Sequence, residues 1–437
     1  MSAVIDRARF VALVEWLGLG LAVGVITGSA SALFLWLLEL ATSFRERHEA
    51  IIFALPLAGL AIGLIYERFG QAIKAGNNLV IDTIHDHGPE LPLRMAPMVL
   101  AGTVLTHLFG GSAGREGTAV QMGAAASDFL AHRLRLGGRQ RLDVLAAGVA
   151  GGFGSVFGTP IAGALFGLEF VVLGRIEYRA LVPALVAAVT GDRVTRALGI
   201  EHTPYPVAPQ LELSAAVLVK WLIFALAVAL TSAAFIELTH ALKKLGERAL
   251  PRLGVRMLVG GALLVVGWQL IGTSDYLGLG VPTIVRAFSD GSLPGYAFAA
   301  KLGFTALTLG AGFLGGEVTP LFFIGAALGN ALASLLGLPL ALGAGVGLAA
   351  VFATCANTPL ALSLMAVELL GANVLPHVAI VASVAYVLVG HRGIYPAQRL
   401  VRHKSGAELD AALALRDVRP PAARPAQGGG GGGVPPS

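Results

Sequence analysis

Long apolar runs constrain this chain more than any other feature of its sequence. Leu, Ala, Val and Gly dominate residues 211–242 and 298–340. Charged residues make up only 13% of the 437 residues, and the mean hydropathy is +0.76, whereas about a quarter of the residues in a soluble domain are charged. A transmembrane β-barrel would show alternating segments of about ten residues instead. The sequence therefore predicts an all-α polytopic membrane protein.

Many of the apolar runs are interrupted or short. They lie at about residues 11–40, 51–68, 95–110, 117–131, 143–173, 180–198, 211–242, 255–272, 297–313, 319–336, 340–354, 359–371 and 374–390. Several cannot cross about 30 Å of hydrocarbon as one straight helix, so we expect paired half-helices that meet inside the membrane. No small-residue cleavage site follows the first run, and we expect Val11 to Leu40 to be a retained long helix rather than a signal peptide.

The remaining composition excludes some partners. The net charge is +5, and the basic residues lie mostly in short polar connections, which the positive-inside rule explains without nucleic acid.

The single cysteine, Cys355, lies in an apolar run and is expected to be a small buried hydrophobic residue. Residues 401–437 are first basic and then rich in Pro and Gly, and we expect a short cytoplasmic tail that is disordered past about Arg416.

The chain contains an internal repeat. Residues 147–169 read AGVAGGFGSVFGTPIAGALFGLE, and residues 345–368 read GVGLAAVFATCANTPLALSLMAVE. Thr159 matches Thr358 and Glu169 matches Glu368, each at an offset of 199 (358 − 159 and 368 − 169). A Gly-rich polar stretch precedes each copy, at 110–123 and at 310–325. Two similar halves with interrupted apolar segments indicate a transporter whose site lies at the interface of the repeats.

Three polar breaks that contain glycine are predicted to converge between the two halves. They are Gly76 to Leu79, Gly114 to Thr118 and Gly315 to Pro320. Each precedes or opens an apolar run, so each offers free backbone N–H groups and the positive end of a helix dipole. Thr118 can cap a new helix, and Pro320 suits a first helical turn. Three such helix ends would form an anion site.

Glu116 is the predicted functional centre. An ionisable residue within an apolar stretch is costly unless it faces protein or water. Its carboxylate would occupy the anion position when ionised and leave it when protonated, which couples protons to anions. The alternative is a structural ion pair with Arg115. Glu317, a second carboxylate at membrane depth, either relays protons or hydrogen-bonds to the neighbouring backbone.

The other polar residues have two possible roles each. Asn77 can donate its amide N–H to an anion or form a turn, and Thr319 can donate its hydroxyl to an anion or cap its helix. Tyr395 could reach inward as a hydroxyl donor or lie at the interface. Glu169 and Glu368 end short apolar runs, where we expect a helix-terminus role.

We expect no metal and no cofactor. His85, Asp86 and His87 are types of residue that bind metals, but their spacing is weak and a polar loop explains them. Asp82 is expected to be a structural partner of the same loop.

These motifs together resemble the CLC family of anion channels and proton-coupled anion antiporters. The matching residues are Gly114-Arg115-Glu116-Gly117, the segment from Phe157 to Glu169, and its repeat from Ala356 to Glu368. The resemblance covers about residues 10–400. It implies a homodimer with one pore per subunit, in which each pore is built from inverted-topology repeats at about 10–200 and 211–395 within a membrane domain of residues 1–400.

Departures from the chloride-handling members point to one branch of this family. Those members carry Gly-Ser-Gly-Ile-Pro where this chain has Gly76 to Val80, a proline in place of Thr118, and a phenylalanine in place of Val318. The set is similar to the bacterial fluoride/proton antiporters. This resemblance implies that Glu116 is the gating glutamate, that Asn77 replaces an anion-coordinating serine, and that Tyr395 is the central tyrosine.

The same resemblance assigns the remaining site residues. Glu317 and Thr319 form the pair that characterises this branch, Gly117 and Val318 join the anion site, and structural roles are implied for Gly76, Gly114, Arg115, Thr118, Gly316 and Pro320. The implied function is export of fluoride across a bacterial inner membrane, driven by proton influx, with fluoride, protons and the lipid bilayer as partners.

Other functions are left open. A chloride/proton antiporter or a CLC chloride channel is the main alternative. An intramembrane hydrolase lacks a catalytic arrangement at helical spacing, so we expect no enzyme. A sodium-coupled carrier would also use broken helices, but a carboxylate between glycines favours protons and anions.

Overall fold

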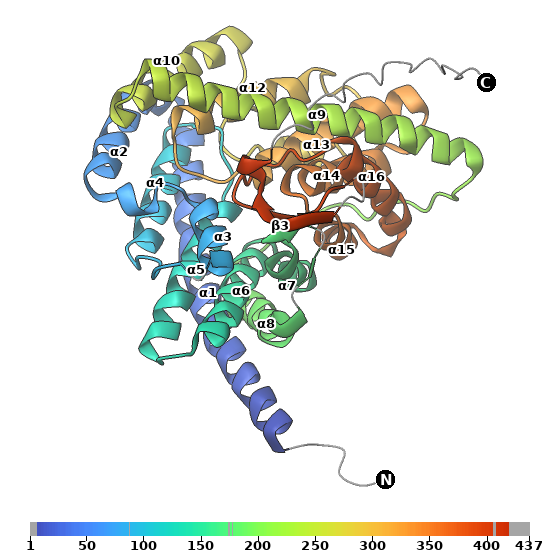
Figure 1. Ribbon diagram of the computed structural model, residues 1–437. Helices are drawn as coiled ribbons and strands as arrows, with labels where there is room; N and C mark the ends of the chain where they lie inside the picture. The colour runs from blue at the N-terminus through green and yellow to red at the C-terminus, as the bar shows by residue number, and fades with distance from the viewer. Residues whose placement is uncertain (1–6, 87, 174, 177, 405–407, 419–437) are drawn as a thin grey trace, which may run out of the picture.

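The computed structural model describes residues 7–86, 88–173, 175–176, 178–404 and 408–418, and helices dominate it (Figure 1). The helices up to residue 200 are α1 (Arg7–Arg47), α2 (Leu55–Phe69), α3 (Asn77–Asp86), α4 (Met95–Leu108), α5 (Glu116–Arg133), α6 (Gly138–Phe157), α7 (Pro160–Glu169) and α8 (Leu181–Ala197). The later helices are α9 (Ala215–Ala249), α10 (Leu253–Ile271), α11 (Val281–Arg286), α12 (Ala297–Ala311), α13 (Val318–Leu336), α14 (Leu340–Ala356), α15 (Pro359–Leu370) and α16 (Leu375–Leu388). Short 3-10 turns lie at Glu49–Ala54, Gln71–Ile73, Tyr178–Ala180, Ala372–Val374 and Leu415–Asp417.

Helices of two lengths make up the membrane region. Within the described residues, five helical segments are long and apolar enough to cross a membrane: Arg9–Arg47, Glu49–Phe69, Ala215–Ala249, Leu253–Ile271 and Val318–Leu336. By contrast, α7 has 10 residues and α15 has 12, so at about 1.5 Å per residue neither can span the bilayer alone. This confirms the predicted half-helices. The first helix is also confirmed, and it is longer than the predicted run.

The two halves pack in matching ways. Helix α5 packs on α6, and α13 packs on α14. Both contacts need glycine, because a Cβ at Gly123 would lie 2.3 Å from the Gly148 carbonyl oxygen and a Cβ at Gly325 would lie 2.1 Å from that of Gly347. Small residues let helix backbones approach closely in membranes. The glycines of the two halves thus bring equivalent helix pairs together.

The half-helices of the two repeats meet each other. Helix α7 packs against α15. Each begins with the proline of a Thr-Pro pair, Pro160 or Pro359, which suits a first turn because the N–H that proline lacks would have no partner there. Each helix ends near a glutamate, Glu169 or Glu368. The sequence repeat is therefore also a structural repeat.

The described residues after α16 include two strands and a 3-10 turn. Strands β2 (Arg399–Arg402) and β3 (Glu408–Ala414) form an antiparallel ribbon, and β2 also pairs in parallel with β1 (Val172–Leu173), which follows α7. Figure 1 shows this ribbon in red in front of the helices. The sequence did not predict it. The predicted disorder past about Arg416 falls largely on residues 419–437, which lie outside the described residues.

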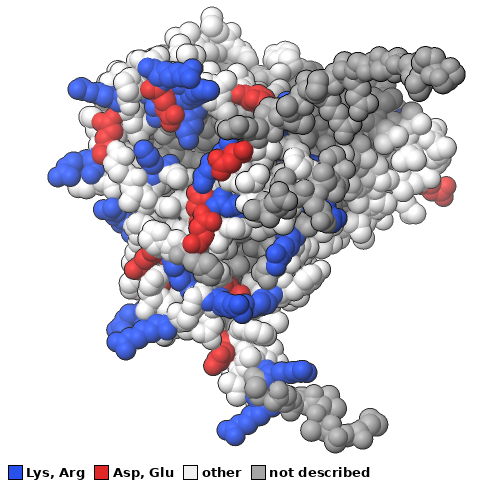
Figure 2. Space-filling view, in the orientation of Figure 1, with Lys and Arg blue, Asp and Glu red and all other residues white. Residues whose placement is uncertain are grey.

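Charged side chains are spread over the face that carries the ribbon. In the orientation of Figure 1, Lys and Arg cover the left and lower parts of the surface, with Asp and Glu among them (Figure 2). Along the chain, basic residues occur in connections between helices, as Lys74 and Arg94 do, and in the C-terminal segment, as Arg416 does. By the positive-inside rule, an excess of Lys and Arg marks a cytoplasmic face.

Candidate functional site

The second and third predicted breaks meet directly at the interface of the two halves. The Gly114 N–H donates to the Gly316 carbonyl at 2.5 Å, and the Gly316 N–H donates to that of Gly114 at 2.7 Å, as an antiparallel bridge. A Cβ at Gly114 would lie 2.9 Å from Pro320 Cδ and 3.0 Å from the Gly316 carbonyl. Glycine is therefore required for the two loops to touch. Helices α5 and α13 begin immediately after this junction.

The Glu116 carboxylate lies at this junction and is fully buried. Its Oε2 accepts from the backbone N–H of Thr319 at 3.1 Å and from that of Arg115 at 3.1 Å, and its Oε1 accepts from the Thr319 hydroxyl. Arg115 Nε lies 3.4 Å from Oε1. The ion pair of the alternative interpretation is thus present, but donors at the N-terminus of α13 also hold the carboxylate. That is how a helix N-terminus binds an anion.

Thr118 does not cap a helix, and this prediction was wrong. Helix α5 already begins at Glu116, with Arg115 in the N-cap position. Thr118 therefore lies inside the first turn, and its hydroxyl is 2.7 Å from the hydroxyl of Thr103 on α4. Both side chains are buried. The glycines before Arg115 let the chain turn into a helix without a hydroxyl cap.

The first predicted break reaches the same place. Gly76 has φ +56°, a left-handed conformation that favours glycine, and α3 begins at Asn77. A Cβ at Gly117 would lie 3.0 Å from Asn77 Nδ2 and 3.8 Å from Glu317 Oε2. Among the described residues, the buried Asn77 Oδ1 and Glu317 Oε1 have no hydrogen-bond partner. Buried polar atoms without a hydrogen-bond partner, such as these two, can bind a ligand, a proton or water.

Tyr395 comes from the segment after α16 and is 3% exposed. Its ring meets Phe170 edge-on, with centroids 5.0 Å apart, and it lines the same cavity as Asn77 and Glu317. The structure thus favours the inward role over the interfacial one. Val318, also buried, is the first residue of α13. All the predicted site residues therefore lie around one junction.

Two cavities approach the junction. A cavity of about 660 Å³ is lined by Asn77, Thr118, Glu317 and Tyr395, and Lys74, Lys243 and Arg256 also line it. A second cavity of about 370 Å³ is lined by Arg115 and Arg45 and by four carboxylates, those of Glu39, Glu46, Glu49 and Asp275. The buried Glu116 lies between residues that line one cavity and residues that line the other. It is therefore placed to separate them.

Sequence reasoning missed three buried basic residues near the junction. The Lys301 ammonium donates to the carbonyls of Tyr276 at 3.1 Å and Gly278 at 2.7 Å. Arg45 donates to the His107 carbonyl at 2.9 Å, and both ring nitrogens of His107 lie within 2.9 Å of backbone carbonyls. A charged residue inside an apolar run, such as Lys301 in residues 297–313, is the signal that could have identified them.

Two of the residues considered for metal binding, His85 and Asp86, belong to a group of polar contacts with Arg399. His85 Nδ1 lies 3.0 Å from Asp86 Oδ1, and Asp86 pairs with Arg399. His87 lies outside the described residues. In the part of the chain that the structure describes, no group of three or more His, Cys, Asp or Glu side chains could hold a metal ion.

Comparisons with known proteins identify the family of this chain and several of its relatives. A family model described as voltage gated chloride channel matches residues 58–390. A chloride/fluoride channel protein of Pseudomonas syringae pv. tomato is 47% identical over 417 residues, which cover 93% of this chain and 91% of that protein. A voltage-gated ClC-type chloride channel of Salmonella typhi is 26% identical, with 88% and 92% covered.

Solved structures have the same fold. The crystal structure of a CLC-type fluoride/proton antiporter matches with a TM-score of 0.86 and 36% identity, covering 91% of this chain and all of that one. A slow cyanobacterial Cl⁻/H⁺ antiporter matches with a TM-score of 0.76 and 19% identity, covering 86% and 94%. The second likeness concerns the fold alone.

Proposed function

Since the chain belongs to the voltage gated chloride channel (CLC) family, we propose that it is a fluoride/proton antiporter of the bacterial inner membrane that exports fluoride on proton influx. The most similar of the solved structures described above is a CLC-type fluoride/proton antiporter. The chain is accordingly a multi-pass membrane transporter. The residues that perform the exchange are those of the junction between α3, α5 and α13.

One observation carries this proposal: the Glu116 carboxylate occupies the position of an anion. The Thr319 N–H and hydroxyl and the Arg115 N–H all donate to it. When Glu116 is ionised, it satisfies these donors and closes the path between the two cavities. When it is protonated, it binds them less well, because a neutral acid gains little from the dipole of a helix N-terminus. An anion can then take its place.

Proton coupling follows from this competition. Each time fluoride enters the site, Glu116 must leave it in its protonated form. Each time Glu116 returns to the site as a carboxylate, it must release that proton. Glu317, which lines a cavity with Asn77 and Tyr395, lies close to Gly117, the residue that follows Glu116, and is placed to receive or release that proton. A hydrogen bond from Tyr395 or Asn77 can stabilise its ionised form.

We assign the selectivity for fluoride to the hydrogen-bond donors at the junction. Fluoride is small and strongly hydrated, so a selective site must replace its water with strong donors in close geometry. The Thr319 hydroxyl and N–H and the Asn77 amide supply such donors beside Gly117, where the missing side chain allows close approach. Charge-assisted hydrogen bonds are the short and strong ones.

The two cavities differ in charge. The larger cavity is lined by three basic residues, Lys74, Lys243 and Arg256, and by three acidic residues, Glu67, Glu247 and Glu317. It opens beside the C-terminal segment, and the positive-inside rule assigns it to the cytoplasm. The smaller cavity has four carboxylates against two guanidinium groups, and such a surface attracts protons and repels the departing anion.

We assign a homodimer with one pore per subunit. Ile161 on α7 and Leu360 on α15 occupy equivalent positions in the two repeats, and they are 50% and 56% exposed. Apolar side chains beside the half-helices form a surface that a second subunit can cover. All residues of the junction come from a single subunit, so each subunit of the dimer would contain its own pore.

The experiment that tests the function is anion efflux from liposomes that contain the purified protein. Fluoride and chloride electrodes are read while external pH is recorded. Fluoride efflux with opposing proton uptake and little chloride movement is expected. Comparable chloride efflux would favour the alternative, a chloride/proton antiporter or CLC chloride channel.

A further inference from the structure

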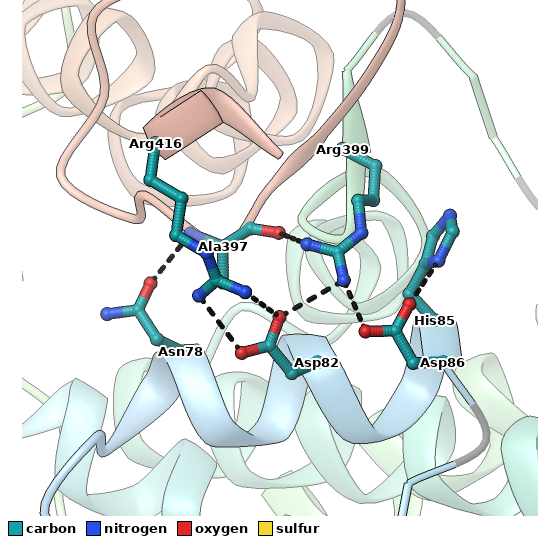
Figure 3. A network of polar contacts seen from close by, with 7 residues as sticks. All are labelled: Asn78, Asp82, His85, Asp86, Ala397, Arg399 and Arg416. Carbon is teal, nitrogen blue, oxygen red and sulfur yellow. Dashed lines mark hydrogen bonds and ion pairs between the residues drawn. The ribbon is translucent and has the colours of Figure 1, made fainter. Parts of the chain in front are cut away.

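One face of α3 is bound to the C-terminal segment. Asn78, Asp82 and Asp86 follow one another at intervals of four residues, which places them on the same side of the helix. Figure 3 shows all three pointing toward the segment that carries Ala397, Arg399 and Arg416. Helix α3 begins at Asn77, so this face leads directly to a residue of the proposed fluoride site.

The contacts are charged and specific. Arg399 Nη2 lies 3.2 Å from Asp82 Oδ1 and 2.5 Å from Asp86 Oδ2. Arg416 donates to both oxygens of Asp82, at 3.1 and 3.2 Å. Two parallel N–H···O bonds between guanidinium and carboxylate fix orientation as well as distance. The Arg399 side chain is only 7% exposed, so solvent screens its ion pairs less than those of a surface arginine.

A backbone contact continues this connection to the site. Asn78 Oδ1 accepts from the Ala397 N–H at 3.0 Å, and Arg399 Nη1 donates to the Ala397 carbonyl at 2.9 Å. Tyr395 lies two residues before Ala397. Asn77 and Tyr395, which line one cavity with Glu317, are therefore also joined through Asn78 and Ala397.

The C-terminal segment is also fixed on its other side. Gln398 Nε2 donates to the carbonyls of Phe170 at 2.9 Å and Ala356 at 2.7 Å, which lie at the ends of α7 and α14. Gln398 is fully buried. The segment is thus anchored to both halves of the protein, and α3 is attached to this anchored segment through Asp82 and Asp86.

We propose that Asp82, Arg399 and Arg416 are positioning residues for fluoride transport, because they hold α3 against the C-terminal segment and so set the spacing between Asn77 and Tyr395. This inference rests on the proposed function. A purely structural clamp would stabilise the protein without affecting which anion it moves. A positioning role instead requires that loosening the clamp weakens fluoride binding and selectivity, since donors around a small anion tolerate little displacement.

The test uses Asp82→Asn, which keeps the size of the side chain and removes the charge that faces both arginines. We expect the KM for fluoride to rise by about threefold or more, the preference for fluoride over chloride to fall, and kcat to change less than KM. Asp82→Glu should bring both quantities back toward the wild-type values. The control is Glu237→Gln, which breaks the exposed Arg392–Glu237 pair away from α3 and should behave as wild type.

Three results would overturn the inference: a wild-type KM and selectivity in folded Asp82→Asn, no recovery in Asp82→Glu, or the same change in Glu237→Gln. If Asp82→Asn does not elute as a folded protein, Arg416→Gln replaces it, because Arg416 is half exposed and Arg399 remains paired. An unchanged fluoride KM in that variant is equally contradictory. Absence of fluoride efflux in the wild-type chain would overturn the proposed function itself, whereas wild-type efflux with unaffected variants overturns only this inference.

Discussion

Glu169 and Glu368 cap each other's half-helices. The Glu169 carboxylate accepts from the N–H groups of Leu360 at 3.2 Å and Ala361 at 2.8 Å, at the start of α15. The Glu368 carboxylate accepts from those of Ile161 at 3.0 Å and Ala162 at 2.8 Å, at the start of α7. Each glutamate lies in the last turn of one half-helix and satisfies the free donors of the repeat-related half-helix. The two repeats are thereby joined by a reciprocal pair of charged caps.

Removing either cap should destabilise the protein. Glu169→Ala and Glu368→Ala each leave two N–H groups at a helix N-terminus without an acceptor, and we expect a loss of about 1–3 kcal/mol in the free energy of unfolding. Glu169→Gln, which keeps one acceptor oxygen, should lose less. Thermal unfolding in detergent checks this, with Glu237→Ala at an exposed site as the control. A melting temperature equal to wild type in both alanine variants would show that the caps contribute nothing.

The sequence predicted those features that depend on local pattern. The repeat at an offset of 199, the proline starts at Pro160 and Pro359, and the glycine breaks around Glu116 are all visible along the chain. A break in an apolar run creates a helix end inside the membrane. Since two similar halves each contain such breaks, the meeting of these helix ends could be inferred. The helix-terminus role expected for Glu169 is likewise confirmed.

The features that it missed depend on contacts between distant segments. That Glu169 caps α15 rather than its own helix follows only from the packing of the two halves, which brings Glu169 to Leu360, 191 residues later in the chain. The strand Glu408–Ala414 reads ELDAALA, which lacks the β-branched and aromatic residues that usually mark a strand. Its pairing with β2 supplies the structure. Thr118 was assigned as a cap because its hydroxyl suits one, yet its partner is Thr103 on another helix.

Glu116→Gln should abolish proton-coupled exchange. Glutamine keeps the shape of the side chain but cannot alternate between an anion and a neutral acid, so fluoride movement should no longer be accompanied by proton movement. Fluoride electrodes and external pH, recorded together on proteoliposomes, measure the coupling. Glu317→Gln in the same assay separates the two carboxylates. Proton uptake that still accompanies fluoride efflux in Glu116→Gln would contradict the gating role.

Thr319→Val should weaken fluoride binding, because it removes the hydroxyl that donates to Glu116 Oε1 and leaves the shape of the side chain almost unchanged. Loss of a hydrogen bond to a charged partner is worth about 1.5 kcal/mol or more, which corresponds to a rise in the fluoride KM of about tenfold. Thr319→Ser retains the hydroxyl and serves as the matched control. Equal values of the fluoride KM in the valine and serine variants would show that the hydroxyl is not part of the fluoride site.

Gly325→Ala should prevent close packing of α13 on α14. A Cβ at this position would lie 2.1 Å from the Gly347 carbonyl oxygen, and both groups belong to helix backbones that cannot move apart locally. We expect a loss of about 3 kcal/mol or failure to fold. Gly303→Ala on α12 is the control, since its Cβ would meet nothing within 4 Å; there alanine should be neutral or stabilising by about 1 kcal/mol. Similar melting temperatures for the two variants would contradict the prediction.

Lys404, in the segment after β2, should make stability depend on pH. Its ammonium donates to Asn357 Oδ1 at 2.7 Å and to the Tyr386 carbonyl at 2.8 Å, and burial lowers the pKa of Lys404 from 10.5 to about 7. Between pH 7 and about 10 the unfolded chain therefore binds more protons at this residue than the folded protein does. The free energy of unfolding then rises with pH in this interval.

We expect the wild-type protein to gain up to about 2.5 kcal/mol from this residue between pH 7 and pH 9, since two pH units at about 1.4 kcal/mol each is the limit for one group. Lys404→Met, which fills the same space without a charge, should lose that increase. Unfolding is measured at both pH values for wild type, Lys404→Met and Lys220→Met, the last of which removes a half-buried lysine that contacts Gly337. A pH-dependent increase that is the same in all three proteins would show that Lys404 is not its source.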